Sequence, residues 1–209
     1  MHPGPPPVPP AEVRILALGD SYTIGESVSA EERWPVQLAK MLRARGIAVA
    51  DPQIVARTGW TTDELSAGID DAKPKGPYDV VTLLIGVNNQ YRGRSIDEYR
   101  AQFRALLARA IEFAGGRASR VIVVSIPDWG VAPFAAGRDA GRIATEIDAF
   151  NRANREEAER KGAAYVDVTA VSRRAQADRG LVAGDGLHPS GAMYAEWTKL
   201  ILPTVLAAL

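Results

Sequence analysis

Short apolar runs alternate with longer stretches of helical period from residue 13 to the end of the chain. The stretches between the runs carry helix signals, such as Ser95 followed three residues later by Glu98 in capping-box spacing. This alternation is typical of repeated βα units and predicts a three-layer α/β/α sandwich with about five mostly parallel strands. The predicted strands are VRILAL (13–18), QIVA (53–56), YDVVTLLIG (78–86), RVIVVSIP (120–127) and AAYVDV (163–168).

Residues 13–209 are predicted to form one domain, because 209 residues with 46% hydrophobic content suit a single compact core. The opening MHPGPPPVPP has no apolar segment of the kind found in signal peptides, and its prolines predict a disordered leader over residues 1–12. The compartment is left undetermined: this opening favours the cytoplasm, and a secreted or periplasmic protein whose signal peptide was removed is the alternative.

Composition argues against several classes of protein. The 25 lysines and arginines balance 25 aspartates and glutamates, so we expect no nucleic-acid partner. The sequence has no run of about 18 apolar residues, so we expect no membrane span. With no cysteine and only two histidines, His2 and His188, we expect neither a metal site nor a cofactor. The sequence also lacks the glycine motifs that bind nucleotide phosphates. The oligomeric state is left open.

Polar segments follow the predicted strands at the points where a ligand would bind. In an open parallel sheet, ligands bind beyond the carboxyl ends of the strands, where the strand order reverses. We therefore expect four loops to lie on one rim. They are GDSYTIG (19–25), RTGWTT (57–62), GVNNQYRG (86–93) and DGLHPS (185–190).

Three residues in these loops fit the chemistry of a serine hydrolase. The Ser21 hydroxyl projects from a tight turn after a strand, and a serine becomes a useful nucleophile when a base takes its proton. His188 is the only histidine outside the leader, and Asp185 stands three residues before it, where it can orient the imidazole. Singly, each residue is equally well explained as a helix cap or a turn residue.

Hydrogen-bond donors for a developing oxyanion are also present. The Asn88 side-chain amide, the Gly59 backbone N–H and the Ser21 backbone N–H are the candidates. Asparagine and glycine are ordinary turn residues, so each one alone is weak evidence. Four separate loops that fit four roles on one rim favour the catalytic interpretation.

In their order and spacing, the four blocks GDSYTIGE, RTGW, GVNN and DGLH resemble those of the SGNH hydrolases, also called the GDSL esterase/lipase family. The resemblance covers residues 13–209 and implies a flavodoxin-like sandwich. It also implies that Ser21 is the nucleophile, His188 the base and Asp185 its partner, with Ser21, Gly59 and Asn88 forming the oxyanion hole. One position departs from the family pattern, because Asn89 stands where an aspartate is usual, and we expect this to affect loop support more than catalysis.

The resemblance implies a small-molecule ester substrate, cleaved through an acyl-enzyme. Short-chain, aryl or acetyl esters are favoured, because no long amphipathic lid is visible. Carbohydrate acetyl esters, thioesters and lysophospholipids remain alternatives, as does a non-catalytic ligand-binding module. Aromatic residues close to the four blocks are the candidates for the pocket wall. They are Tyr22, Tyr91, Trp129 and Phe134, with Trp60 as a weaker candidate, whereas Trp34 and Trp197 have the helical spacing of core residues.

Overall fold

The structure of the protein is a computed structural model that describes residues 12–209. All but the last residue of the predicted leader, residues 1–11, lie outside the described part. Five strands form one sheet in the order β2-β1-β3-β4-β5, and every pair of neighbours is parallel. This confirms the predicted three-layer sandwich, and the strand order is the flavodoxin-like one. The strands are β1 (Ile15–Gly19), β2 (Gln53–Ala56), β3 (Val80–Leu84), β4 (Val121–Val124) and β5 (Ala164–Val166).

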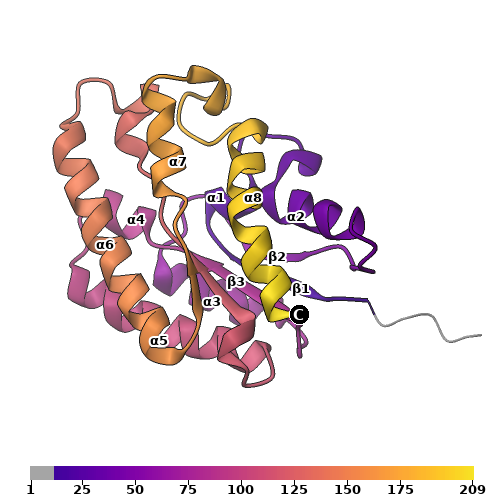
Figure 1. The fold of residues 1–209 in the computed structure, drawn as a ribbon. Coiled ribbons are helices and arrows are strands. Elements are labelled where there is room, and N and C mark those ends of the chain that lie inside the picture. Colours follow the sequence, from indigo (N-terminus) through magenta and orange to yellow (C-terminus); the bar gives the residue numbers. More distant parts are fainter. Residues whose placement is uncertain (1–11) are drawn as a thin grey trace, which may run out of the picture.

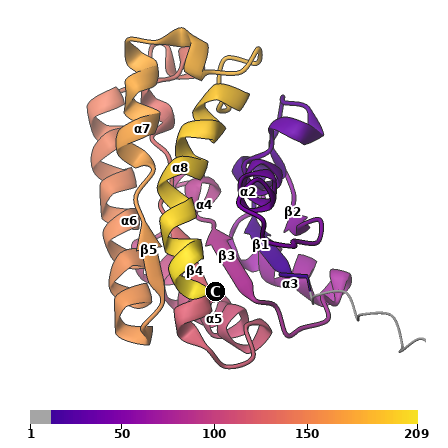
Figure 2. The same ribbon diagram turned by 45° about the vertical axis from the view of Figure 1, so that its right-hand side comes forward.

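Helices cover both faces of the sheet (Figure 1). The helices α2 and α8 pack against each other on one face, and α3, α5 and α6 pack side by side on the other (Figure 2). The helices are α1 (Ser21–Ile24), α2 (Trp34–Arg43), α3 (Thr62–Ala72), α4 (Val87–Tyr91), α5 (Ile96–Phe113), α6 (Ala140–Lys161), α7 (Thr169–Arg173) and α8 (Gly191–Ala208). None of these helices is long and apolar enough to cross a membrane.

The central strands are buried on both faces, which explains why they read as continuous apolar runs in the sequence. All residues of β1, β3 and β4 are buried between the two helical layers. Helix α5 begins at its predicted cap, and α3 begins at a capping box. The Ser95 hydroxyl accepts the N–H of Glu98 at the start of α5, and Thr61 and Glu64 form a reciprocal capping box at the start of α3.

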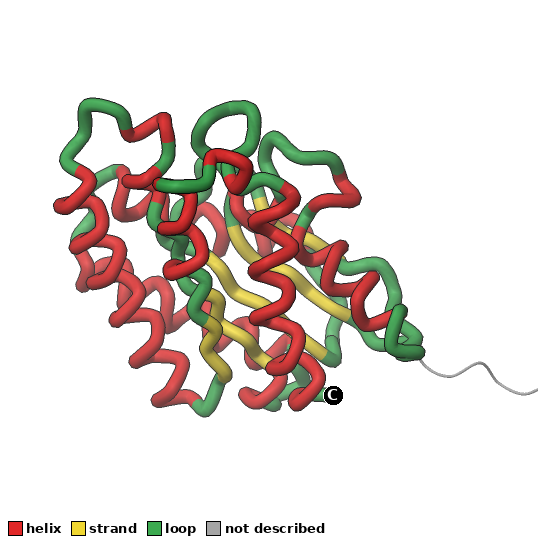
Figure 3. The backbone as a smooth tube through the Cα atoms, turned by 45° about the horizontal axis from the view of Figure 1, so that its top comes forward, coloured by secondary structure: helices red, strands yellow, loops and turns green. Residues whose placement is uncertain are grey.

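The loops at the carboxyl ends of the strands gather along one edge of the sheet (Figure 3). Gly19 at the end of β1 pairs with Leu84 at the end of β3, so the segments that follow these two strands start next to each other. Those segments are the short helices α1 and α4, neither of which was predicted from the sequence. The sheet therefore brings the first and third polar loops together at the point where the strand order reverses.

Candidate active site

Ser21 is the first residue of α1 and follows β1 after a single intervening residue. That residue, Asp20, caps α1 by accepting the Tyr22 N–H at 3.0 Å through Oδ1. Within the described residues the backbone N–H of Ser21 donates no hydrogen bond. The turn therefore presents both the hydroxyl and the amide hydrogen of Ser21 at the end of the sheet.

The Asp20 carboxyl is fully buried directly beneath this turn. Burial raises the pKa of Asp20 from 3.8 to about 7, although the hydrogen bond from the Tyr22 N–H opposes the rise. The second carboxyl oxygen has no hydrogen-bond partner among residues 12–209. Asp20 is therefore poised to carry a proton near neutral pH, which the sequence did not indicate.

His188 is held by Asp185 from the same loop. The ring Nδ1 of His188 lies 2.6 Å from Asp185 Oδ2, and His188 as a whole residue is 8% exposed. Asp185 Oδ1 accepts the backbone N–H groups of Leu187 and His188 at 2.9 and 3.0 Å. The turn between the two side chains depends on Gly186, whose φ of +74° lies in the left-handed region that glycine adopts readily.

A further hydroxyl, that of Ser27, donates to Asp185 Oδ2 at 2.6 Å. Burial by itself would raise the pKa of Asp185, but the hydrogen bonds from Ser27, the His188 ring and the two backbone N–H groups outweigh it and hold this pKa well below its ordinary value. Asp185 is thus a carboxylate that accepts four hydrogen bonds. Sequence reasoning missed Ser27, which lies in the loop after α1 with no motif to mark it.

Asn88 is joined to the second polar loop through its side-chain amide. Asn88 Nδ2 donates one hydrogen to the Trp60 carbonyl at 2.9 Å, which leaves the second hydrogen of this amide without an acceptor among the described residues. The neighbouring Gly59 has a φ of +85°, where a side chain would be strained, and its N–H donates no hydrogen bond within residues 12–209. The Arg92 guanidinium donates to the Gly59 carbonyl at 2.7 Å and so holds this loop from α4.

Asn89 occupies the position where the family resemblance leads one to expect an aspartate. Its side chain is fully buried. Its Oδ1 accepts the Thr62 N–H at 3.1 Å, and its Nδ2 donates to the Thr62 hydroxyl at 2.7 Å. Asn89 therefore ties α4 to the first turn of α3.

A cavity of about 160 Å³, which we call the serine cavity, collects most of the candidate residues. Its wall contains Ser21, His188 and Asn88, although no hydrogen bond joins the Ser21 hydroxyl to the His188 ring. Gly59 and Asp185 do not line the cavity. Gly59 lies beside it through the Trp60–Asn88 contact, and Asp185 lies behind the His188 ring.

The four predicted pocket aromatics, Tyr22, Tyr91, Trp129 and Phe134, all line the serine cavity. Tyr22 lies beside the His188 ring, with 5.5 Å between the ring centroids. The other three rings contact one another with centroids 5.4 to 6.4 Å apart. Trp60 does not line the cavity; its ring packs on Gly68 of α3, where an added Cβ would come within 2.0 Å of it.

The geometry suits acyl transfer. Ser21, His188 and Asn88 line one small cavity, with Asp185 bonded to the imidazole behind it and Gly59 beside it, and these are residue types that such a reaction uses. The structure offers no comparable set for a metal, since residues 12–209 contain no group of three or more histidines, aspartates or glutamates that could hold an ion.

Comparisons with known proteins give both a family and a fold. The model of the GDSL-like Lipase/Acylhydrolase family matches residues 17–196. No curated protein matches the chain by sequence.

Several solved structures share the fold of this chain at low sequence identity. TesA is 19% identical with a TM-score of 0.73, and the match covers 94% of this chain and 99% of TesA. The psychrotrophic esterase EstA from Pseudoalteromonas sp., solved with monoethylphosphonate as inhibitor, is 16% identical with a TM-score of 0.69, covering 94% of this chain and 98% of EstA. The acetylxylan esterase Axe2 from Geobacillus stearothermophilus is 20% identical with a TM-score of 0.69, covering 92% and 94%.

Proposed function

Because the chain belongs to the GDSL-like lipase/acylhydrolase family and is a carboxylic ester hydrolase, we propose that it cleaves short-chain, aryl or acetyl esters through an acyl-enzyme on Ser21. The observation that carries the proposal is the serine cavity, which Ser21, His188 and Asn88 line together. The ester would enter this cavity with its carbonyl carbon against Ser21.

In the first half of the reaction, Ser21 Oγ attacks the ester carbonyl carbon and His188 takes the hydroxyl proton. Because His188 Nδ1 is bound to Asp185, its Nε2 is the nitrogen left to act as the base. The Asp185 carboxylate then stabilises the imidazolium that forms. Its four hydrogen bonds keep it ionised and fixed in orientation, so it does not compete for the proton.

The negative charge on the carbonyl oxygen would be stabilised by the N–H groups of Ser21 and Gly59 and by the Asn88 amide. The two backbone N–H groups donate no hydrogen bond within the described residues. The Asn88 amide is fixed by the Trp60 carbonyl, so its second hydrogen is held in place before the substrate arrives. Donors that need no reorganisation stabilise the transition state most effectively.

The first half ends when His188 gives its proton to the departing alcohol oxygen, and the bond between this oxygen and the acyl carbon breaks to leave the acyl-enzyme. In the second half, a water molecule attacks the acyl carbon while His188 takes its proton. His188 then returns this proton to Ser21 Oγ as the bond between Ser21 Oγ and the acyl carbon breaks, which releases the acid and restores the Ser21 hydroxyl. Each step transfers one proton through the same imidazole, so the site needs no other titrating group.

The size of the serine cavity supports small acyl groups. A volume of about 160 Å³ is below the roughly 300 Å³ at which pockets for drug-sized ligands begin, and the wall is largely aromatic and aliphatic. The names of the similar structures include an acetylxylan esterase, which makes acetylated carbohydrates one class to test. We therefore expect acetyl and other short acyl esters to be better substrates than long-chain ones.

Hydrolysis of a chromogenic acetate by the wild type and by Ser21→Ala tests the proposal. We expect the wild type to release the chromophore and Ser21→Ala to lose that activity while keeping the wild-type melting temperature. A panel of acyl lengths and acetylated sugars on the wild type then ranks the substrate classes. Equal rates for the wild type and Ser21→Ala would refute the acyl-enzyme on this serine.

A further inference from the structure

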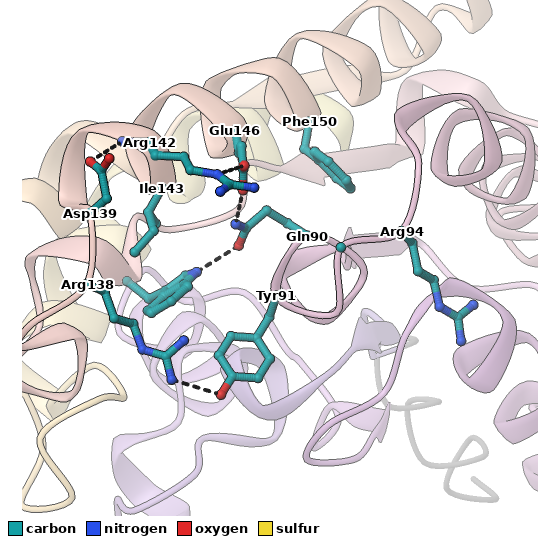
Figure 4. A pocket seen from close by; sticks show the side chains of 11 residues that line it. Gln90, Tyr91, Arg94, Arg138, Asp139, Arg142, Ile143, Glu146 and Phe150 are labelled. Carbon is teal, nitrogen blue, oxygen red and sulfur yellow. Dashed lines mark hydrogen bonds and ion pairs between the residues drawn. The ribbon is translucent and has the colours of Figure 1, made fainter.

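A second, larger pocket opens beside the serine cavity, with a volume of about 510 Å³ (Figure 4). We call it the arginine pocket, because Arg94, Arg138 and Arg142 line it. Tyr91 and Trp129 belong to the walls of both spaces. A substrate bound at Ser21 would therefore reach the arginine pocket with whichever part extends past these two rings.

Most side-chain hydrogen-bond acceptors of the arginine pocket already have protein donors, and Asp139 Oδ2 is the one without a donor among the described residues. Glu146 accepts Gln90 Nε2 through one carboxyl oxygen and Arg142 Nε through the other, both at 2.7 Å. The Gln90 carbonyl oxygen accepts the Trp129 indole N–H at 2.8 Å. Asp139 Oδ1 accepts the backbone N–H of Arg142 at 2.9 Å. The groups of this pocket that remain free to bind a ligand are therefore mainly hydrogen-bond donors.

Arg138 supplies most of these free hydrogen-bond donors. Its guanidinium lies 5.2 to 5.3 Å from the ring centroids of Tyr91, Trp129 and Phe134, and one of its N–H groups donates to the Tyr91 hydroxyl at 3.2 Å. It has no carboxylate partner among the described residues. The three rings thus fix a cation with several unused N–H groups at the edge of the serine cavity.

The other two arginines of this pocket are already paired with carboxylates. Arg142 binds Glu146, and Arg94 binds Asp63 at 2.7 Å and Glu98 at 3.2 Å, with its side chain pointing away from Arg138 in Figure 4. A ligand with its own negative charge would therefore complete the pairing of Arg138.

The geometry points to an anion-binding subsite in the arginine pocket. The alcohol part of the substrate binds there, and Arg138 pairs with an anionic group on it, such as a carboxylate. This inference rests on the proposed ester hydrolysis at Ser21. The alcohol part is assigned here because His188 must protonate the leaving oxygen, and the aromatic cluster under Arg138 is joined to the His188 loop. The Phe134 N–H donates to the Gly186 carbonyl at 2.9 Å.

A pair of acetate esters that differ only in charge tests the inference. They are 4-acetoxybenzoate, which carries a carboxylate on the alcohol part, and the neutral 4-acetoxybenzamide. The ratio of their kcat/KM values is measured for the wild type and Arg138→Gln, so that the intrinsic reactivities of the two esters cancel. We expect the ratio to fall about 2- to 5-fold in Arg138→Gln, as for an ion pair at an exposed site.

Arg45→Gln is the matched control, since Arg45 is an exposed arginine that follows α2 at the opposite edge of the sheet. It should leave the ratio unchanged, and raising the salt concentration should lower the ratio in the wild type and in Arg45→Gln but not in Arg138→Gln. An unchanged ratio in Arg138→Gln, with both esters still cleaved in a Ser21-dependent way, would overturn the subsite and leave the proposed function intact.

If neither ester is cleaved, the proposed function fails, and binding of the product 4-hydroxybenzoate still decides on the subsite. Calorimetry should then show that 4-hydroxybenzoate binds more weakly to Arg138→Gln than to the wild type. Equal affinities for the two proteins would refute the inference independently of catalysis.

Discussion

Removal of the Ser27 hydroxyl should lower activity through Asp185. Ser27 Oγ and His188 Nδ1 both lie 2.6 Å from the same carboxylate oxygen, so the hydroxyl helps to fix the oxygen that orients the imidazole. A hydrogen bond to a charged group is worth about 1.5 to 3 kcal/mol, and we take about 1 kcal/mol because the Asp185 side chain is 29% exposed. If this loss appears in the transition state, kcat/KM falls about 5-fold.

Backbone strain at Ser27 allows its role in the site to be separated from its role in folding. Its φ of +63° is unfavourable for any residue except glycine, by about 1 to 2 kcal/mol. Ser27→Ala keeps the strain and loses the hydroxyl, so it should lose about 1 kcal/mol of stability. Ser27→Gly also loses the hydroxyl but relieves the strain, so its free energy of unfolding should stay near that of the wild type.

Both Ser27 variants should therefore lose the same activity while they differ in stability. The assay is kcat/KM on a chromogenic acetate, with chemical denaturation of the same samples. Ser29→Ala is the control, because the Ser29 hydroxyl bonds Glu32 in a capping box away from Asp185, and this variant should lose stability only. The reasoning is refuted if kcat/KM of the two Ser27 variants follows their stability, or if neither variant loses activity.

Four further predictions concern the site and its surroundings. Asn88→Ala should lower kcat about 10²- to 10³-fold with a smaller change in KM, whereas Asn89→Ala should cost about 1 kcal/mol of stability and keep its turnover. Steady-state kinetics and melting curves check both, and near-wild-type kcat in both variants would contradict the oxyanion role of Asn88. Because the pKa of Asp20 is raised from 3.8 to about 7, its contribution to stability is fully present below about pH 4 and is lost as the pH rises to about 7. Asp20→Asn cannot ionise and should not show this loss, so its free energy of unfolding minus that of the wild type should rise by up to about 4 kcal/mol between about pH 4 and pH 7. Chemical denaturation of both proteins at several pH values measures this difference. A difference that does not change with pH would argue against a protonated Asp20 in the folded protein. A serine-directed phosphonate should label one residue and abolish activity, and peptide mapping should find the adduct on Ser21 and nowhere else. Activity should survive exhaustive chelation; loss of activity with EDTA and its recovery with a divalent ion would indicate a metal-assisted mechanism.

The sequence predicted the sheet well because parallel strands buried on both faces are short apolar runs. All five predicted strands are present. The strand β2 has the predicted ends, and the ends of the other four differ from the prediction by one to three residues, as hydrogen-bond-based limits commonly do. The short helices α1 and α4 were missed because four or five residues cannot show a helical period. Both helices carry candidate residues, so the least predictable elements of the fold lie at the site.

The contacts that hold the candidate residues were less predictable than the residues themselves. Ser21, Gly59, Asn88, Asp185 and His188 stand in recognisable blocks. Ser27 and Arg138, by contrast, reach the site from loops where sequence spacing predicts no partner. Their partners are 158 residues away for Ser27 and 47 for Arg138, and only the folded chain brings them together. The sequence indicated the type of reaction, but it did not indicate Ser27, which orients Asp185, or Arg138, which we propose selects the substrate.

The parts of the site differ in how tightly they are bound to the sheet. Ser21 and Asn88 follow β1 and β3, whose paired ends at Gly19 and Leu84 lie in the buried centre of the molecule. The His188 loop follows no strand directly. Turn contacts hold it, such as the Ala183 N–H to the His188 carbonyl at 2.7 Å and the Ser190 N–H to the Leu181 carbonyl at 2.9 Å. Residues 182–187 of this loop are half-buried or exposed, whereas every residue of β1 and β3 is buried, so opening the loop needs less free energy than opening the sheet. Exchange of its amide hydrogens should thus precede that of β1 and β3, and partial denaturation should abolish activity before the fold is lost.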